Sequence, residues 1–447
     1  MAGSRVIEQK KSGDIQQSFI LLARWIAIAL VTGVCSALIV ALFNITLEWG
    51  LAAAPRWIPR APFIVPLLGA VIVGTLLVRR VPEAGGEGIP SYLRSVNAGT
   101  GRLSLAATAL KFPATIVTLG SYCSGGIVGP LARICAGAGS STTVLLGRIF
   151  KLHGEEDIRI AAICGVSGAV SAIFHAPLGG GFFAAEILRK ESLRYSDLFP
   201  SILTGGVAYA ASRHLLGQEP IFRVAAPAFS MTGALALWLL LVAVVAGAFG
   251  VLFIISFERT SRAFHRLPFG QPGRAAIAGI LVSAAWLLHA RWALGTSMPF
   301  FFSVAGGDPA AVVTHPFLRD HVSLFLVIVL FVKIAATSLT VGSGMSGGFT
   351  GPLIILGMGS GALMSSLSGF GAGTPAYHSC IACGVAAILG AAMNIPIAAI
   401  IITIRIFGAY YALPAIIGGI LAFFIFKSRT IYEYSTAASA RGGRTTK

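Results

Sequence analysis

Long apolar stretches, separated by short polar or glycine- and proline-rich segments, dominate the hydrophobic pattern of this chain. A helix needs about 20 apolar residues to cross the hydrocarbon core of a bilayer, and many of the stretches reach that length. Others are too long for one crossing, or too rich in Gly and Pro for one straight helix, which favours helix pairs and broken helices. The pattern predicts an all-α polytopic membrane protein. Candidate spans lie near 19–47, 62–79, 103–120, 130–150, 159–190, 197–216, 230–256, 273–294, 322–341, 351–369, 379–404 and 410–426.

Composition supports a chain that faces lipid over most of its surface. Only 11% of the 447 residues are charged and 56% are hydrophobic, whereas a soluble domain carries about 25% charged residues. The net charge of +17 would suggest a nucleic-acid partner in a soluble protein. Here we expect no nucleic acid, because basic loops that face the cytoplasm and anionic lipid explain most of the excess. A second interpretation is that part of the charge draws anions into a vestibule.

Both ends of the chain are polar. Segment 1–18 precedes a long apolar span and lacks the features of a cleavable signal peptide, so we expect that span to stay in the membrane. The segment 435–447 is polar and basic. The positive-inside rule then predicts a multi-pass protein of the cell (inner) membrane with both termini in the cytoplasm.

A glycine-rich segment occurs twice. Residues 111–130, KFPATIVTLGSYCSGGIVGP, match 333–352, KIAATSLTVGSGMSGGFTGP, at 11 of 20 positions without a gap. Residues 163–177 and 382–396 also share Cys-Gly-Val and a final proline, and FPSILTGG at 199–206 resembles LPAIIGG at 413–419. Three blocks in the same order indicate gene duplication.

Duplicated membrane halves suggest a transporter-like fold with its site between the repeats near the midplane. The residues alone leave open whether the repeats are parallel or inverted. The expected division is an N-terminal segment 1–18, a first repeat 19–216, a linker 217–229, a second repeat 230–434 and a tail 435–447.

The repeated segments SGGIVGP and SGGFTGP each end where a helix begins, with Pro130 or Pro352 suited to its first turn. Unpaired backbone is not tolerated in lipid, so these segments face protein or a cavity. First-turn N–H groups carry the positive end of the helix dipole and bind anions. We therefore favour an anion site that needs no full positive charge over glycines that serve only close helix packing. PEAGGEGIP at 82–90 has the same character.

Two lysines, Lys111 and Lys333, precede the repeated segments by several helical turns. One interpretation is that they set a positive potential at the entrances. The other is that they are interface anchors whose side chains snorkel to the membrane surface.

Five motifs in order resemble the CLC family of chloride channels and anion/proton exchangers, over about residues 20–435. GGEGIP resembles the family's GSGIP segment, GGIVGP its G-[KR]-E-G-P segment and GGFTGP its G-x-F-x-P segment. FHAPLGGGFFAAEI resembles its F-N-A-P helix start, and RTIYEYS at 429–435 resembles the segment with its central tyrosine. The similarity is to prokaryotic members without a C-terminal regulatory domain.

The resemblance implies a homodimer with one pore per subunit, inverted repeats and broken helices that meet at a midplane anion site. It implies a central anion held by backbone N–H groups and by the tyrosine hydroxyl. An outer site would use the N–H groups of Val128 and Gly129, and an inner site those of Glu87 and Gly88. The central position would be formed by Phe349, Thr350 and Tyr432.

This chain departs from the family at the residues that handle protons. Val128 occupies the position of the gating glutamate, and Ile187 occupies that of the exchangers' inner glutamate, directly after Glu186. Neither residue ionises. On that basis the sequence predicts no anion/proton exchange.

Glu87 stands where the family has its central-site serine. A carboxylate repels a neighbouring anion, so either it is protonated or the anion leaves. One hypothesis is that Glu87 is a displaced gate whose protonation is linked to anion occupancy. The other is that its side chain turns away, to a basic residue or a vestibule, with only its backbone at the pore.

The expected function is passage of chloride or a similar monovalent anion, as a channel or uncoupled transporter without the usual gating glutamate. A proton-coupled transporter that uses Glu87 is one alternative, and a non-transporting membrane scaffold or sensor is another. No nucleophile–base pair or metal-ligand spacing indicates an enzyme, a metal site or a cofactor other than the bound anion. Cys380 and Cys383 have a C-x-x-C spacing on an apolar helix, and we expect them to serve core packing.

Overall fold

The computed structural model describes residues 2–57, 62–150, 154–188, 193–228, 231–287, 290–313 and 315–432, which form helices and short connections. The predicted tail 435–447 lies outside the described residues. The first-half helices are α1 (Ala2–Trp57), α2 (Val65–Ile72), α3 (Ile89–Asn97), α4 (Leu105–Gly120), α5 (Val128–Phe150), α6 (Glu155–Phe174), α7 (Pro177–Glu186) and α8 (Tyr195–Ala210). The second-half helices are α9 (Gly233–Arg266), α10 (Gln271–Leu287), α11 (Met298–Ala305), α12 (Pro316–Asp320), α13 (Val322–Gly342), α14 (Thr350–Ser368), α15 (Pro375–Met393), α16 (Pro396–Phe407) and α17 (Ala412–Phe426).

Seven of the described helices are long and apolar enough to cross a membrane. Some of them, such as α6 and α15, are almost entirely buried inside the protein, whereas α1, α9 and α17 keep exposed apolar faces. An exposed leucine-rich face on a helix is expected where lipid replaces water as the solvent. The prediction of an all-α polytopic membrane fold is confirmed.

Two of the predicted spans are broken helices related by the repeat. Span 159–190 is α6 followed by α7, and the break is at His175, which adopts a left-handed conformation with φ 52°. Span 379–404 is α15 followed by α16, with Asn394 at φ 61° in the same role. A proline begins each second helix. His175 is thus a helix-capping residue.

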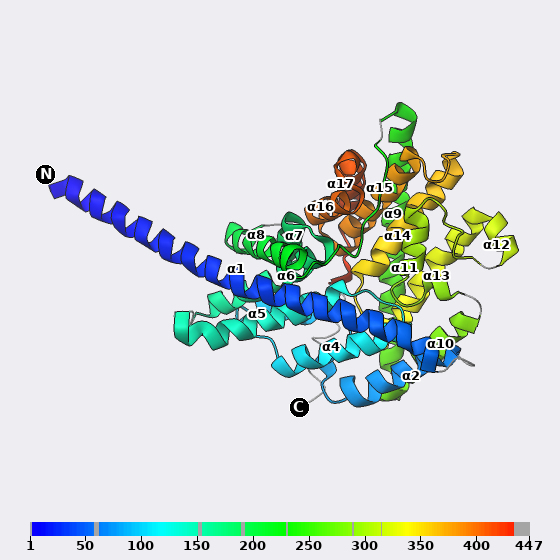
Figure 1. Ribbon diagram of the computed structural model, residues 1–447, viewed down its shortest axis with the longest axis horizontal. Coiled ribbons are helices and arrows are strands. Elements are labelled where there is room, and N and C mark those ends of the chain that lie inside the picture. Colours follow the sequence, from blue (N-terminus) through cyan, green and yellow to red (C-terminus); the bar gives the residue numbers. More distant parts are fainter. Residues whose placement is uncertain are drawn as a thin grey trace.

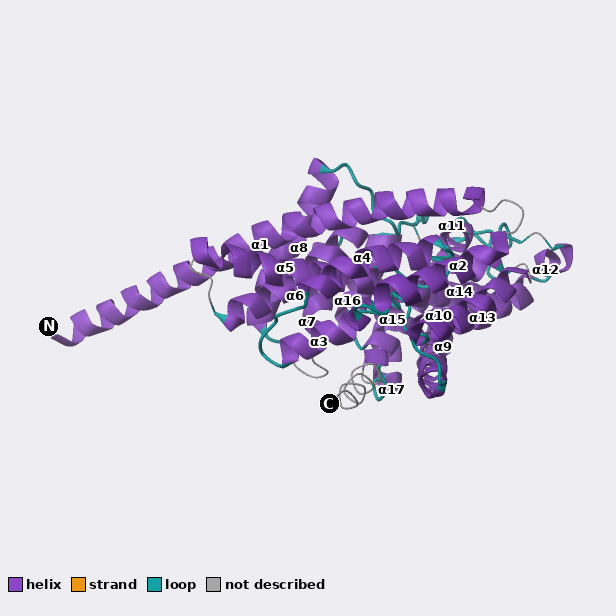
Figure 2. Cartoon of the chain, turned by 90° about the horizontal axis from the view of Figure 1, so that it is seen from below, coloured by secondary structure: helices purple, strands orange, loops and turns teal. Residues whose placement is uncertain are grey.

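The two halves use corresponding helix pairs. In the first half α5 packs against α6, and in the second half α14 packs against α15. In Figure 1 the first-half helices are coloured blue to green and the second-half helices green to red, and α2 of the first half packs beside α10 of the second half. The long helix α1 lies along one edge of the body in the second view and packs on α4, α5, α6 and α8 (Figure 2).

The halves meet where the two glycine segments cross. Gly126 and Gly348 form an antiparallel bridge, each donating its N–H to the other's carbonyl at 2.7 Å. A Cβ on Gly125 would lie 3.2 Å from the Cα of Gly347, and one on Gly348 would lie 2.9 Å from the nitrogen of Gly129. The glycines therefore do permit close packing, here between the two segments themselves, and this contact joins the repeats at their common centre.

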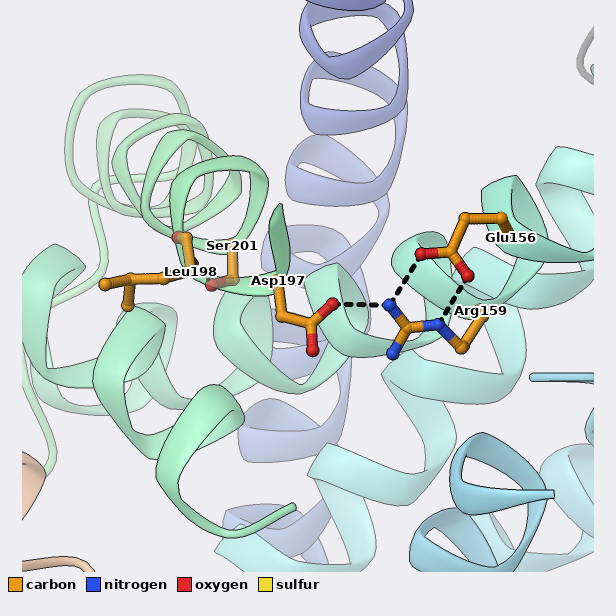
Figure 3. A network of polar contacts seen from close by, with 5 residues as sticks. All are labelled: Glu156, Arg159, Asp197, Leu198 and Ser201. Carbon is orange, nitrogen blue, oxygen red and sulfur yellow. Dashed lines mark hydrogen bonds and ion pairs between the residues drawn. The ribbon is translucent and has the colours of Figure 1, made fainter. Parts of the chain in front are cut away.

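A buried ion-pair network fixes the beginnings of α6 and α8. Arg159 forms two hydrogen bonds of 2.7 Å with Glu156 and one of 2.5 Å with Asp197 (Figure 3). Only 7% of the Arg159 side chain and 3% of the Asp197 side chain are exposed. Arg24 of α1 pairs with Asp157 beside this network. The ion pairs thus tie three first-half helices together.

Candidate anion-binding site

Glu87 lies in the loop that leads into α3. This loop has two glycines with positive φ, Gly86 at 64° and Gly88 at 107°, which residues with a Cβ rarely adopt. Gly86 donates its N–H to the carbonyl of Gly344, so the loop is tied to the second half. This backbone path turns Glu87 into the protein, where only 4% of the residue is exposed.

The Glu87 carboxylate is held by donors from three segments. Oε2 accepts a 2.8 Å hydrogen bond from the N–H of Ile89, in the first turn of α3. Oε1 accepts a longer one, 3.5 Å, from the hydroxyl of Tyr432, and the backbone of Phe349 bonds the same carboxylate. The side chain therefore does not turn away to a basic residue or a vestibule, and that expectation is wrong.

Gly129 makes room for this carboxylate. A Cβ at position 129 would lie 2.0 Å from Oε1 of Glu87 and 3.1 Å from its backbone oxygen. Any other residue would collide with the side chain. The first repeated segment thus contributes a gap rather than a charged group, and Glu87 fills it.

The remaining residues of the implied anion site are buried at the starts of two helices. Val128 is fully buried in the first turn of α5, and Phe349 and Thr350 are buried at the start of α14. The Phe349 ring packs edge-on against Phe253 and Phe257, at 5.6 and 4.8 Å between centroids. This packing fixes the backbone at the start of α14, where first-turn N–H groups favour an anion.

The interpretation of the repeated lysines as snorkelling anchors is wrong, whereas a positive potential at the entrances stays a prediction. Lys111 and Lys333 are fully buried, so neither side chain reaches the membrane surface. Lys111 donates to the carbonyls of Gly85 and Gly86, at 3.1 and 2.9 Å, and to Ser346 across the repeat boundary. Lys333 donates to the carbonyl of Gly295 at 3.0 Å and to Ser124, again across the boundary. Each lysine thus supports the loop that its own half contributes and a serine of the other half.

Glu186 caps a helix of the second half. Its oxygens accept hydrogen bonds from the N–H groups of Ile397 and Ala398, at 3.1 and 2.8 Å, at the start of α16. Its repeat counterpart Arg405 donates to the carbonyl of His175 at 2.7 Å. Ile187, at the exchanger position, is buried in the main apolar core. The residues that contact Glu186 and Ile187 are therefore different from those that hold the Glu87 carboxylate.

A hollow of about 110 Å³ opens beside the first glycine segment. Its lining includes Gly125, Gly126 and Ile127, together with Thr296 and an exposed carboxylate, Glu48 of α1. Glu48 does not stand out in the sequence, because one acidic residue near the end of a long span is ordinary. Its place beside the glycine segment depends on how α1 crosses the fold.

Two further features, a repeat block and a buried arginine, were missed at the level of sequence. Gly295 and Ser297 have positive φ, as Gly86 and Gly88 have, and each pair precedes a proline at the same spacing. The matching offset of 209 in the two Gly-x-[Gly/Ser]-x-Pro segments was a signal that could have revealed this block. Arg133 lies in the predicted span 130–150, and an ionisable residue inside a span is a functional signal by default.

The fold and the site define a helical membrane protein with two repeats whose glycine segments meet around a buried polar centre. Residues 69–427 match the family model described as "Voltage gated chloride channel". An uncharacterized protein of Methanocaldococcus jannaschii is 27% identical over 418 residues, 93% of this chain and 96% of its own length. A putative chloride channel protein, ClcB-like, of Ralstonia nicotianae is 27% identical over 79% of this chain and 80% of its length.

The structure is similar to a crystal structure described as a CLC-type fluoride/proton antiporter, with a TM-score of 0.78. The match covers 92% of this chain and 98% of that one, at 22% identity, and so concerns the fold. Because the family model spans most of the chain, the protein belongs to the CLC (voltage gated chloride channel) family.

Proposed function

We propose that this protein passes chloride or a similar monovalent anion across the membrane, as a channel or an uncoupled transporter. The observation that carries the proposal is the set of donors around Glu87. Its carboxylate, itself an anion, is bonded by the backbone at Ile89 and Phe349 and by the hydroxyl of Tyr432. Donors that hold a carboxylate oxygen are suited to a small anion, and the two backbone donors lie at helix starts, where the dipole favours negative charge.

The absence of a carboxylate at two positions supports uncoupled passage. Val128 is an apolar residue in the first turn of α5, and Ile187 is part of the apolar core. A proton carrier must gain and lose a proton, which neither side chain does. Antiport of fluoride and protons is an activity of the protein with the similar crystal structure, and that protein shares only 22% of its residues with this chain.

A second candidate function, proton-coupled anion transport, rests on the same carboxylate. Glu87 and an anion compete for the donors at Phe349 and Tyr432, so one displaces the other. Protonation removes the charge of Glu87 and weakens its hold on those donors. Anion occupancy would then be linked to proton uptake, with Glu87 in the place of the missing gate.

Efflux from liposomes tests the proposal. Purified protein in chloride-loaded vesicles is expected to release chloride when valinomycin and potassium clamp the potential, without a fixed number of protons moving. Proton movement in constant ratio to chloride would favour the coupled alternative. Efflux no faster than from protein-free vesicles would overturn passage altogether and favour a scaffold or sensor.

We also propose a homodimer in the cell (inner) membrane with both termini in the cytoplasm. Support comes from the family resemblance and from the basic terminal segments. Exposed apolar side chains on α8, α16 and α17 offer a surface for a second copy, among them Leu203, Ile397 and Ile420. Cross-linking in native membranes is expected to give a band of twice the chain mass.

A further inference from the structure

Arg133 of α5 is a buried cation with an unused donor. Only 1% of the residue is exposed. Its Nε donates to the hydroxyl of Ser91 on α3 at 2.8 Å, and its Nη1 donates to the hydroxyl of Thr108 on α4 at 2.9 Å. Its Nη2 is buried and makes no hydrogen bond in the described part of the chain. Two hydroxyls therefore fix the guanidinium plane, and Nη2 remains without an acceptor among the described residues.

A buried guanidinium with an unpaired donor is stabilised by an anion at that donor. Arginine does not lose its charge in proteins, so burial cannot be relieved by deprotonation. An unpaired buried charge is strongly unfavourable. Within the described residues, no carboxylate that forms an ion pair does so with Arg133. The partners of these carboxylates are Arg24, Arg159, Arg213, Arg223 and Arg262.

Arg133 lies next to the loop that carries Glu87. A Cβ on Gly88 would be 2.9 Å from the Cβ of Arg133 and 2.6 Å from the Cε of Lys111. Arg133 follows Val128 by five residues, so it lies roughly 7.5 Å further along the axis of α5. Lys111 directs its Nζ to backbone carbonyls and Ser346, which leaves the arginine as the cation with a donor to offer.

We propose that Nη2 of Arg133 binds a monovalent anion, such as chloride, at a subsite between α3, α4 and α5. The subsite rests on the proposed function and adds to it a fixed positive charge beside the backbone donors. It holds an anion while the carboxylate of Glu87 occupies the donors of Phe349 and Tyr432. The chain thus keeps one anion bound next to the centre even when the centre itself is filled by its own side chain.

The experiment must distinguish a bound anion from two other possible partners of Nη2. Glu83, an exposed residue of the same loop, acts electrostatically on Arg133 and could serve as a direct partner. A structural water is the other partner, and it would make Arg133 a packing residue. Only a bound anion makes chloride affinity depend on Arg133 and not on Glu83.

The experiment is calorimetric titration of chloride into the purified full-length protein in detergent. Arg133→Gln is expected to weaken chloride binding at least about tenfold, because it removes a charge-assisted hydrogen bond. Arg133→Lys should keep part of the affinity. Arg94→Gln removes an exposed arginine from the same helix α3 as Ser91, and Glu83→Gln removes the rival carboxylate. Both should bind chloride as the wild type does.

Wild-type affinity in Arg133→Gln would overturn the subsite, and so would an equal loss in Glu83→Gln. If neither Arg133 variant folds, anomalous diffraction from bromide-soaked wild-type crystals decides: a peak beside Nη2 supports the subsite and none refutes it. Liposome efflux by the wild type tests the proposed function separately. Passage without Arg133-dependent binding refutes only the subsite, and binding without passage refutes only the transport function.

Discussion

Oε1 of Glu87 and the hydroxyl of Tyr432 lie 3.5 Å apart, although the two residues are 345 positions apart in the chain. The contact brings the loop before α3, in the first half, to the last described residue of the second half. Both side chains are almost fully buried, with 4% exposure each. A carboxylate of the protein thus occupies a position that the family resemblance implies for a bound anion.

Gly129→Ala should expel the Glu87 carboxylate from this position, because the new Cβ would lie 2.0 Å from Oε1. With the competing charge displaced, chloride efflux from liposomes at neutral pH is expected to rise several-fold. Gly206→Ala is the matched control, since a Cβ there meets nothing within 4 Å. Unchanged efflux in a folded Gly129→Ala protein would show that Glu87 does not obstruct passage.

Lys333→Met should destabilise the protein without touching Glu87. The ammonium donates to the carbonyls of Ala293 and Gly295 and to two serine hydroxyls. Each carbonyl that loses its donor costs about 1–3 kcal/mol. The midpoint of thermal unfolding in detergent is expected to fall by many degrees, whereas Lys427→Met, at an exposed site, should leave it nearly unchanged. Equal midpoints would mean that the buried lysine does not support the loop.

Glu186 is expected to act as a helix cap and not as a proton carrier. Glu186→Ala removes the acceptor for Ile397 and Ala398, which should cost about 0.5–2 kcal/mol of stability. Glu186→Gln keeps an acceptor and should lose less. The dependence of chloride efflux on pH should be the same in both variants as in the wild type. A changed pH profile in Glu186→Gln would instead give this carboxylate a role in proton transfer.

Asp197→Asn should show how strongly the buried network holds α6 and α8. It removes the negative charge that pairs with Arg159, and breaking a buried ion pair in this way costs about 3–5 kcal/mol. Thermal unfolding in detergent measures the loss. Glu219→Gln breaks an exposed pair with Arg213 and is expected to have little effect. Similar midpoints for the two variants would contradict the structural role of the network.

The repeat and the broken helices could be predicted because they depend on local chemistry. Identical glycines at 126 and 348 reflect a backbone contact that no larger residue permits, and prolines at 177 and 396 begin helices. The side-chain directions of Lys111 and Lys333 could not be predicted, because each reaches across to a serine of the other half. Periodicity shows which face of a helix a residue occupies but not what that face meets.

Glu87 shows the same limit within the candidate site. The motif placed it beside the expected anion position, but two directions for its side chain were compatible with the sequence. The direction depends on the empty space that Gly129 leaves and on donors from Ile89 and Tyr432. The last of these comes from the far end of the described chain.

The most direct test of the account is chloride efflux from liposomes as a function of pH, for the wild type, Glu87→Gln and Glu87→Ser. Protonation removes the charge that competes with the anion, so wild-type efflux should rise as the pH falls. Glu87→Ser, which neither ionises nor fills the gap beside Gly129, should give high efflux that is nearly independent of pH, and Glu87→Gln should also lose most of the pH dependence. An unchanged pH dependence in both variants would contradict the central role of Glu87.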